Sequence, residues 1–312
     1  MTTQHVPVMC AQILDILSSS LSAPGAILVD ATLGLGGHSL AALMRFDSVT
    51  VIGIDRDPQA IEAASLRLSP YAGRFEIHQA IYDEISTILD GRRADAILFD
   101  LGLSSLQIDS APRGFAYSAD APLNMRMDAD ESRLTAADVV NTYSFEDLVR
   151  IFRIYGEEKF AARIARAIVD ARAQEPFSTS ARLVDVIASA VPQGQTRGHP
   201  AKRVFQAIRM EVNDERTHLE KALPQALESL NLNGRMAVLS YHSGEDRLVK
   251  QVFAQAQSDR VPHGIPVVPT QLQARFRLVV RGALKPSDDE MMSNPRSQSA
   301  RLRVIERIKE DR

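Results

Sequence analysis

A glycine-rich turn near the start of the chain holds the first residues that could do chemistry. In the stretch VDATLGLGGHS, residues 29–39, an apolar segment runs into Gly34, Gly36, Gly37 and His38 before a helical pattern begins. Glycine has no Cβ, so the backbone N–H groups of such a turn can come close to a ligand at a helix start. The turn therefore predicts a ligand site.

Two carboxylates follow this turn, each at the end of an apolar segment. Asp55 comes 19 residues after Gly36, where a carboxylate can accept hydrogen bonds from the hydroxyls of a ribose. Asp100 ends the segment AILFD, and we expect it at a buried strand end that faces a cleft. There it could orient an amine or the amino group of a cofactor, with a cap or turn role as the alternative.

The spacing of the glycines bears on which cofactor the turn holds. The dinucleotide fingerprint G-x-G-x-x-G is met by Gly34 and Gly36, but Ser39 takes the third glycine position. A ribose occurs in both nicotinamide dinucleotides and S-adenosylmethionine, and the missing third glycine favours the latter. A tight turn without a ligand is the remaining interpretation.

These residues need a sheet to position them. Apolar runs alternate with helical stretches in the first third of the chain, which is typical of βαβ units and a mostly parallel sheet in an α/β protein. Asp57 followed by Pro58 predicts a helix start. The strands expected are 26–31, 49–57, 74–80, 94–102, 236–243 and 300–308. A helix at 214–231 and a turn at 233–235 are expected before the fifth of these strands.

The middle of the chain has a different composition. Residues 109–147 are acidic and loop-like, whereas residues 150–209 are helical and basic, with eleven Lys or Arg against five Asp or Glu. We therefore expect one domain made of residues 1–110 and 205–312, interrupted by a helical substrate-recognition subdomain at 111–204.

Bulk properties narrow the class of protein. The 312 residues carry a net charge of −3, so a nucleic-acid partner would need a local basic patch. One cysteine excludes an intramolecular disulfide and a Cys-rich zinc site, and the seven histidines show no ligand spacing, so no metal is expected. Neither a leader pattern nor a membrane-spanning run is apparent, which favours the cytoplasm and no membrane partner.

Ten blocks of the sequence, in order, resemble one known family. The chain is closely similar to the 16S ribosomal RNA (cytosine-N4) methyltransferase family, called RsmH or MraW. The blocks are HVPVM, ATLGLGGHS, IGIDRDPQAI, LFDLGLSSLQID, RGFAY, PLNMRMD, YGEEKFAARIARAIV, HPAKRVFQAIRMEVNDE, SYHSGEDRLVK and NPRSQSARLRV.

The resemblance implies a Rossmann-like class I methyltransferase. Its cofactor would be S-adenosyl-L-methionine and its substrate the exocyclic N4 amine of a cytidine in the decoding region of 16S ribosomal RNA, in the small ribosomal subunit. A homodimer is also possible in such a protein. By motif, the cofactor residues would be Gly36, Gly37, His38, Asp55, Tyr82, Asp100 and Gln107. The chain departs from the family at Tyr82, usually phenylalanine, at Asn124, usually aspartate, and at Gly244, usually leucine.

Methylating a cytosine amine requires an acceptor for its N–H, because the nitrogen lone pair is delocalised into the ring. Many amino-methyltransferases use an Asp/Asn-Pro-Pro-aromatic motif, and no Pro-Pro pair occurs in this chain. Asp100 is the preferred catalytic acceptor, while the carbonyl of Leu101 or Gly102 and the hydroxyl of Ser104 are alternatives.

Substrate contacts would come from aromatic and basic side chains. A base taken out of its stack is held on an aromatic ring or an arginine, and phosphates are held by Lys and Arg. Tyr241 is the best-placed ring, because the other candidates are more typical of a core or rim: Phe115, Tyr117, Tyr143 and Tyr155. The remaining candidates for RNA contact are His242, Arg113, Lys202 and Arg203, with Ser104 beside them.

Other functions remain open at this point. A nicotinamide-dependent oxidoreductase would share the glycine turn and Asp55, but would give no reason for the basic insert. A non-catalytic ribosome-assembly protein would keep the basic patch without an intact cofactor loop. A DNA amino-methyltransferase is disfavoured by the missing Pro-Pro-aromatic motif.

Overall fold

The chain divides into two compact units in the computed structural model. The first comprises Met1–Gly102 with His218–Arg312, and the second Leu103–Thr217. The residues that the structure describes are 7–104, 107, 113–128, 133–192, 198–259 and 272–310.

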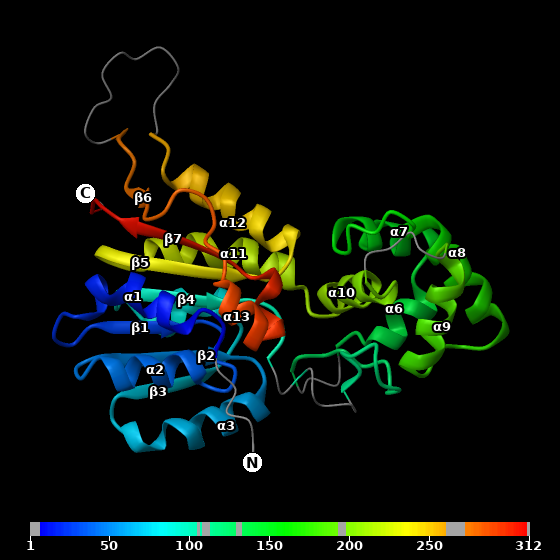
Figure 1. Ribbon diagram of the computed structural model, residues 1–312, viewed down its shortest axis with the longest axis horizontal. Coiled ribbons are helices and arrows are strands. Elements are labelled where there is room, and N and C mark those ends of the chain that lie inside the picture. The colour runs from blue at the N-terminus through cyan, green and yellow to red at the C-terminus, as the bar shows by residue number, and fades with distance from the viewer. Residues whose placement is uncertain are drawn as a thin grey trace, which may run out of the picture. The chain divides into compact units, whose positions relative to one another are not determined.

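A seven-stranded sheet forms the frame of the first unit. Its strands lie in the order β3-β2-β1-β4-β5-β7-β6, as Figure 1 shows. The first five are parallel, and β7 and β6 join them antiparallel. The bounds are β1 (Ile27–Asp30), β2 (Thr50–Asp55), β3 (Phe75–Gln79), β4 (Ala94–Asp100), β5 (Leu230–Ser240), β6 (Phe276–Leu278) and β7 (Arg301–Arg307).

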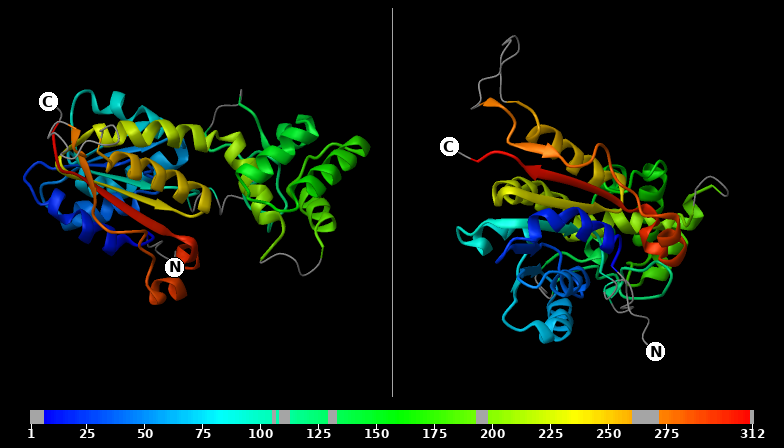
Figure 2. Two further views of the ribbon diagram at one scale, coloured as in Figure 1. Left: turned by 90° about the horizontal axis from the view of Figure 1, so that it is seen from above. Right: turned by 60° about the vertical axis from the view of Figure 1, so that its left-hand side comes forward.

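Helices cover both faces of this sheet, and Figure 2 shows the two layers from above. One apolar core lies between the sheet and α1 (Cys10–Leu21), α2 (Gly37–Arg45) and α3 (Pro58–Leu68). The other lies against α4 (Ile85–Leu89), α11 (Glu215–Glu228) and α12 (Ser243–Ala256). The remaining short elements are η1 (Ser69–Tyr71), η2 (Tyr82–Glu84), α13 (Asp288–Ser293) and η5 (Pro295–Ser299).

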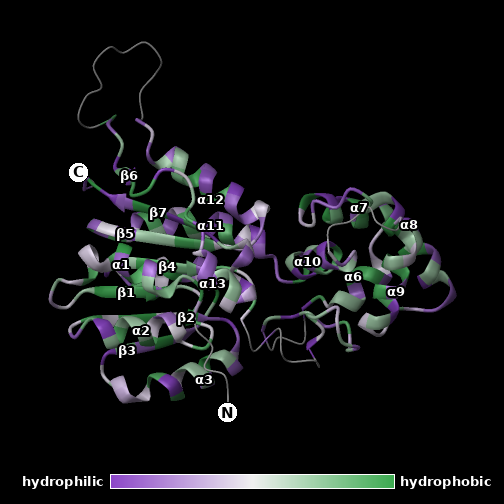
Figure 3. Cartoon of the chain, in the orientation of Figure 1, coloured by the Kyte–Doolittle hydropathy of each residue, from purple (hydrophilic) through white to green (hydrophobic). Residues whose placement is uncertain are grey.

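Strand periodicity explains the two cores. Leu28 and Leu98 face the core beside α1, whereas their neighbours Val29 and Ile97 face the core beside α11. Side chains alternate between the faces of a strand, so a strand buried on both faces must be apolar throughout. The green colour of β1 in Figure 3 reflects this.

The second unit is helical. Its helices are α6 (Ala136–Thr142), α7 (Phe145–Ile154), α8 (Ala161–Gln174), α9 (Ser180–Ala190) and α10 (Ala201–Val212). They bury one face each in a common core; on α8 these residues are Ala161, Ile164, Ala165 and Ile168, at helical spacing. On α8 the exposed Arg163 and Arg166 lie outside this buried face.

The expected α/β class with a mostly parallel sheet is confirmed. The strands predicted near 26–31, 49–57, 74–80, 94–102 and 300–308 are all present. Asp57 caps α3 by accepting a hydrogen bond from the N–H of Gln59, with Pro58 at the first position. Three elements were not expected from the sequence: α1, β6 and α13.

The turn predicted at 233–235 is wrong. β5 already begins at Leu230 and continues through this stretch, with a register shift against β4 between Ala94 and Ala96. Asn233 has a left-handed backbone conformation (φ 63°) at this irregularity, and the strand continues beyond it.

The division between the units also differs from the expected one. We expected boundaries at 110/111 and 204/205, whereas the compact units meet at Gly102/Leu103 and Thr217/His218. The second boundary shifts because α10 packs on α6, α7 and α9 and shares their core. The 109–147 stretch is also not wholly a loop, since α6 lies within it and begins with a capping box between Thr135 and Asp138.

No helix in the described part of the chain is both long and apolar enough to cross a membrane.

Candidate active site

The glycine turn joins β1 to α2 as predicted. Gly34 and Gly36 have left-handed backbone conformations (φ 51° and 70°), which glycine adopts without strain. Gly36 is also packed closely, because a Cβ there would lie 3.3 Å from the Cβ of Ala64 on α3. The turn is therefore held against a neighbouring helix, with its helix N-terminus at the carboxyl edge of the sheet.

Asp55, the last residue of β2, is tied to this turn. Its Oδ2 accepts a hydrogen bond from the N–H of Gly34 at 2.8 Å, and its Oδ1 accepts one from the N–H of Asp57 at 2.9 Å. Burial raises the pKa of Asp55 to about 6, although both hydrogen bonds act against the shift. Each carboxylate oxygen has a second lone pair, so the group can still accept a hydrogen bond from a ligand.

Asp100, the last residue of β4, is held by two side chains. Its Oδ1 accepts a hydrogen bond from the hydroxyl of Tyr241 at 2.7 Å, and its Oδ2 lies 3.3 Å from Nε2 of His38. Its backbone N–H donates to Oγ1 of Thr32 at 2.6 Å. The side chain of Asp100 is 24% exposed, so the carboxylate is oriented by the protein and still reaches solvent.

The protonation of both partners fits this arrangement. Burial alone would lower the pKa of His38, but its contacts with the Asp100 carboxylate and the Cys10 thiol outweigh burial and raise it to about 10. The pKa of Tyr241 is also raised, first by burial and then by the charge of Asp100. At neutral pH, His38 is therefore an imidazolium and Tyr241 a phenol that donates.

Asp30, the last residue of β1, lies at the same edge of the sheet and was not predicted from the sequence as a site residue. It is 1% exposed, and its Oδ2 accepts a hydrogen bond from Oγ of Ser39 at 2.7 Å. Its Oδ1 is buried and has no hydrogen-bond partner among the described residues. The sequence feature that could have identified Asp30 is its position, as an acid that ends an apolar strand just before the glycine turn. Ser39, which broke the dinucleotide fingerprint, is the partner of this acid.

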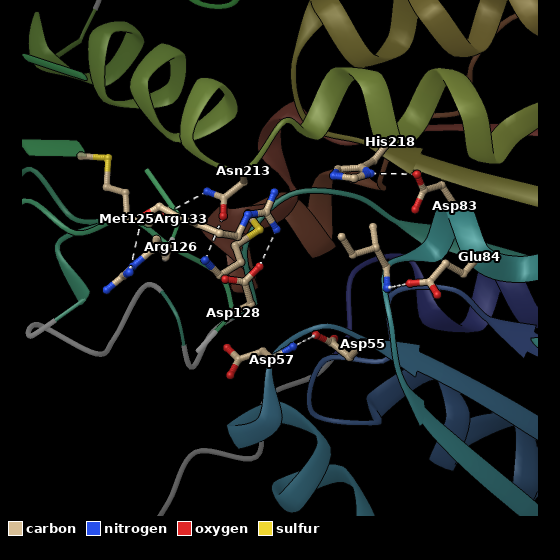
Figure 4. A network of polar contacts seen from close by, with 12 residues as sticks. Asp55, Asp57, Asp83, Glu84, Met125, Arg126, Asp128, Arg133, Asn213 and His218 are labelled. Atoms are coloured by element: carbon tan, nitrogen blue, oxygen red, sulfur yellow. Dashed lines mark hydrogen bonds and ion pairs between the residues drawn. The ribbon is translucent and has the colours of Figure 1, made fainter. Parts of the chain in front are cut away.

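Tyr82 lies just beyond the end of β3. Its ring packs edge-on against Phe99 of β4, with centroids 5.8 Å apart and planes at 79°. The next residue, Asp83, accepts a hydrogen bond from Nδ1 of His218 on α11 at 2.8 Å, and Figure 4 shows this pair beside Glu84. The short helix that carries Tyr82 is thus held in place on the sheet edge.

Tyr241 and His242 come between β5 and α12. His242 is the N-cap residue of α12, and Glu245 closes a capping box with it. Asp246 forms an ion pair with Arg303 of β7 at 2.7 Å. Gly244 therefore does not deprive Glu245 and Asp246 of defined partners, although a Cβ there would lie 3.2 Å from Nδ1 of His242.

The structure describes the remaining predicted residues within the second unit. Oε1 of Gln107 accepts a hydrogen bond from the N–H of Ser104 at 3.0 Å, and Gln107 is buried. Arg113 donates to the carbonyls of Arg126 and Met127, so its guanidinium holds a loop together.

Lys202 and Arg203 begin α10, and both side chains are exposed. Nη1 of Arg203 donates to the carbonyl of Glu157 at 3.2 Å. Beside them, the ring of Tyr117 stacks on His199 at 4.8 Å.

The other aromatic candidates of the second unit have internal roles. Phe115 is buried in the helical core, and the hydroxyl of Tyr143 donates to Oε1 of Glu211 at 3.0 Å. Tyr155 packs against the same core. This matches the expectation that most of these rings are core or rim residues.

Taken together, the sheet edge suits a nucleoside-containing cofactor. Four neighbouring parallel strands bring Asp30, Asp55, Tyr82 and Asp100 to one edge, beside a glycine turn and a helix N-terminus. The unpartnered Oδ1 of Asp30 is a buried acceptor that a ligand amine could satisfy. No cluster of His, Cys, Asp or Glu in the described ranges could hold a metal ion.

Known proteins are similar to this chain over nearly its full length. The chain is 52% identical to the ribosomal RNA small subunit methyltransferase H of Thermobifida fusca, covering 98% of this chain and 94% of the relative. It is 51% identical to the protein of the same name from Streptomyces avermitilis, with 99% and 98% covered. A crystal structure of an rRNA methylase from Streptococcus thermophilus aligns with a TM-score of 0.45 at 11% identity, covering 98% of this chain and 99% of that one.

Residues 2–308 match the MraW methylase family. The match includes the glycine turn, Asp55 and Asp100, so it decides between the two cofactor classes that the turn alone left open. The chain belongs to the MraW methylase family and is a methyltransferase that uses S-adenosylmethionine.

Proposed function

We propose that this enzyme methylates the exocyclic N4 amine of a cytidine in the decoding region of 16S ribosomal RNA. The observation that carries the proposal is the 52% identity, over 98% of the chain, to a ribosomal RNA small subunit methyltransferase H. The choice of the N4 amine rests on the family resemblance and on Asp100, a partly exposed acceptor at the carboxyl edge of the sheet.

The glycine turn and the strand-end acids would hold the cofactor. Gly36 and Gly37 would let it approach the backbone, Asp55 would accept its ribose hydroxyls, and the ring of Tyr82 would lie against its adenine. When bound, S-adenosylmethionine supplies a methyl group attached to a positively charged sulfur. The amine takes the methyl group, and the sulfur is left as a neutral thioether. The enzyme's main task is then to align the amine with that methyl group.

Asp100 would be the catalytic acceptor. The cytosine amine is a weak nucleophile, and a carboxylate that accepts a hydrogen bond from its N–H favours a nitrogen with an available lone pair. Tyr241 and His38 keep the Asp100 carboxylate oriented from its two oxygens. After the methyl transfer the amine nitrogen is positively charged, and it becomes neutral when Asp100 accepts one of its protons.

RNA contacts would come from both units. In the first unit, Tyr241 and His242 follow β5 at the same edge as Asp100. In the second unit, the exposed Lys202 and Arg203 would contact phosphates. Ser104, Arg113 and Gln107 keep their predicted roles in this proposal, the first two toward RNA and the third toward the cofactor.

The decisive experiment transfers a labelled methyl group to purified small subunits from cells that lack this enzyme. Digestion to nucleosides and mass spectrometry should yield N4-methylcytidine, and mapping should place it at one decoding-region position. Asp100→Asn should reduce the rate about 100-fold or more. Label on a ribose hydroxyl or a ring carbon, or on no small-subunit RNA, would contradict the proposal.

Two finer predictions concern the cell. The enzyme is expected to act in the cytoplasm, where the small subunit is found, and to form a homodimer. Light scattering during gel filtration of the purified protein would measure its mass, and a purely monomeric species at micromolar concentration would argue against the dimer.

A further inference from the structure

The segment Pro7–Met9, which we call the strap, lies directly on the cofactor turn. A Cβ at Gly37 would come within 2.5 Å of Cγ of Pro7, which no real structure tolerates. Gly37 does not have the left-handed backbone of Gly34 and Gly36. The glycine at position 37 is therefore needed because Pro7 packs against its backbone, and not because of the turn conformation.

A distant carboxylate fixes the strap. The N–H of Met9 donates to Oε1 of Glu290 at 2.6 Å, across 281 residues of sequence. Met9 is the N-cap residue of α1 and has a left-handed backbone (φ 53°), and its own side chain makes no capping hydrogen bond. Glu290 lies on α13 and is anchored there, because its own N–H donates to Oγ of Ser287. The contact therefore joins the start of the chain to its C-terminal part.

The strap continues into the site. Cys10, the residue after Met9, is close enough to His38 to contribute to the raised pKa of that imidazole, and Nε2 of His38 lies 3.3 Å from the Asp100 carboxylate. Glu290 is also close enough to Tyr241 for its charge to contribute to the raised pKa of that phenol. One chain of contacts thus runs from α13 through the strap to the turn and to the group that would accept the substrate amine.

We propose that Glu290 is a positioning residue for cofactor binding. By accepting the Met9 N–H it holds Pro7 against Gly37, so the glycine turn keeps the shape that binds S-adenosylmethionine. Glu290 does not itself touch the cofactor in this proposal. Its effect therefore acts on cofactor affinity and not on the rate of the chemical step at saturating cofactor.

Two substitutions separate the hydrogen bond from the charge. Glu290→Gln retains an acceptor oxygen for the Met9 N–H, whereas Glu290→Met has a similar length and no strong acceptor. We expect the Kd for S-adenosylmethionine, measured by calorimetry, to rise about tenfold in Glu290→Met and less than about threefold in Glu290→Gln. Asp289→Asn, an exposed acid on the same helix, is the matched control and should bind the cofactor normally.

Steady-state kinetics provide the second measurement. With small subunits as substrate, Glu290→Met should raise KM for the cofactor about tenfold while kcat stays within about twofold of the wild-type value. A wild-type Kd in Glu290→Met would overturn the proposal. So would an equal loss of affinity in Glu290→Gln, because that result would assign the effect to charge.

Pro7→Gly keeps the proposal testable if Glu290→Met folds poorly. Removing the ring should raise the cofactor Kd about threefold, and combining it with Glu290→Met should add little, because both changes act through the strap. Fully additive effects, or a wild-type Kd in Pro7→Gly, would show that the strap does not connect Glu290 to the turn.

Discussion

The two units use their polar side chains in different ways. In the first unit the sheet forms the frame, and its strand-end carboxylates are held by polar groups: Tyr241 and His38 hold Asp100, and Asp55 accepts from the backbone of the glycine turn. In the second unit, polar side chains form hydrogen bonds with backbone groups of a loop that no sheet satisfies. Asn213 and Arg113 bind backbone groups of the loop around Met125 and so attach it to the helical core.

Because of this difference, we expect substitutions in the first unit to affect mainly ligand binding and those in the second unit to affect mainly folding stability. Where the sheet satisfies most of the backbone, an amide that keeps an acceptor oxygen can replace a strand-end carboxylate with a smaller effect on folding than on ligand binding. Where a side chain satisfies buried backbone groups, its loss leaves them without partners, and folding suffers first. We therefore expect substitutions in the two units to differ in kind as well as in size.

The largest effect should follow the loss of Asn213. Its side chain, which is 1% exposed, donates to the carbonyls of Met125 and Arg209 and accepts from the N–H of Met127, as Figure 4 shows in part. Asn213→Ala should lower the free energy of unfolding by about 3 kcal/mol, because it leaves buried backbone groups unpaired. Urea unfolding would measure this.

The matched variant is Asn141→Ala. Asn141 donates one hydrogen bond to the backbone of Phe177 and accepts one from it, which is one bond fewer than Asn213 makes. Asn141 is also only half-buried, so water can replace it and the loss should be smaller. Equal losses in the two variants would contradict the role of burial.

The second effect concerns cofactor affinity in the first unit. Asp55→Asn should raise the Kd for S-adenosylmethionine about 30-fold at pH 7.5, because ribose hydroxyls lose a charged acceptor. Below pH 6 the affinity of the wild-type protein should fall about tenfold per pH unit, because the pKa of Asp55 is raised to about 6. Calorimetry across pH 5–8 would show both, and an equally steep pH dependence in Asp55→Asn would assign it to another group.

The same carboxyl has the opposite effect on folding. Its folded-state pKa exceeds the ordinary value of 3.8, so its contribution to stability is present below about pH 4 and is lost as the pH rises through 6. Asp55→Asn should therefore remove this loss, and the free energy of unfolding of the variant without cofactor should change less between pH 4 and 6.

The third effect tests the exposed basic residues at the start of α10. Lys202→Glu with Arg203→Glu should weaken binding to small subunits about tenfold at moderate salt and leave the cofactor Kd unchanged. The exposed pair Lys221→Glu with Lys250→Glu, on α11 and α12, makes the same change in net charge in the first unit. If the control pair weakens binding equally, net charge and not a phosphate contact explains the result.

The smallest effect should come from an arginine with a structural role. Arg182 donates to the carbonyls of Pro176 and Ala171 and lies 4.5 Å from the centroid of the Phe177 ring. Arg182→Lys should destabilise the protein by about 1 kcal/mol, because lysine cannot make both bonds from one planar group. Thermal unfolding would detect this, and RNA affinity should stay the same; a weakened RNA complex would instead place Arg182 among the phosphate contacts.

Counting basic residues from the sequence could not make this distinction. The excess of Lys and Arg at 150–209 suggested an RNA surface, but Arg172, Arg182 and Arg209 are engaged with carbonyls or carboxylates inside their own unit. Lys202 lies exposed instead. A Lys or Arg side chain can contact RNA only if carbonyls and carboxylates of its own unit do not engage it. The positions of those groups depend on the fold and cannot be read from the sequence.

The sequence by itself determined the alternation of strands and helices, the glycine turn and the acids that end β2 and β4. Those features depend on local periodicity, on glycine's lack of a Cβ and on the rule that parallel strands end at one edge. Only the tertiary structure decided that Tyr241 and His38 hold Asp100, that Asp30 pairs with Ser39, and that Glu290 fixes the strap. The partners in the first and last of these contacts lie more than 60 residues apart, and strand order and packing bring such residues together.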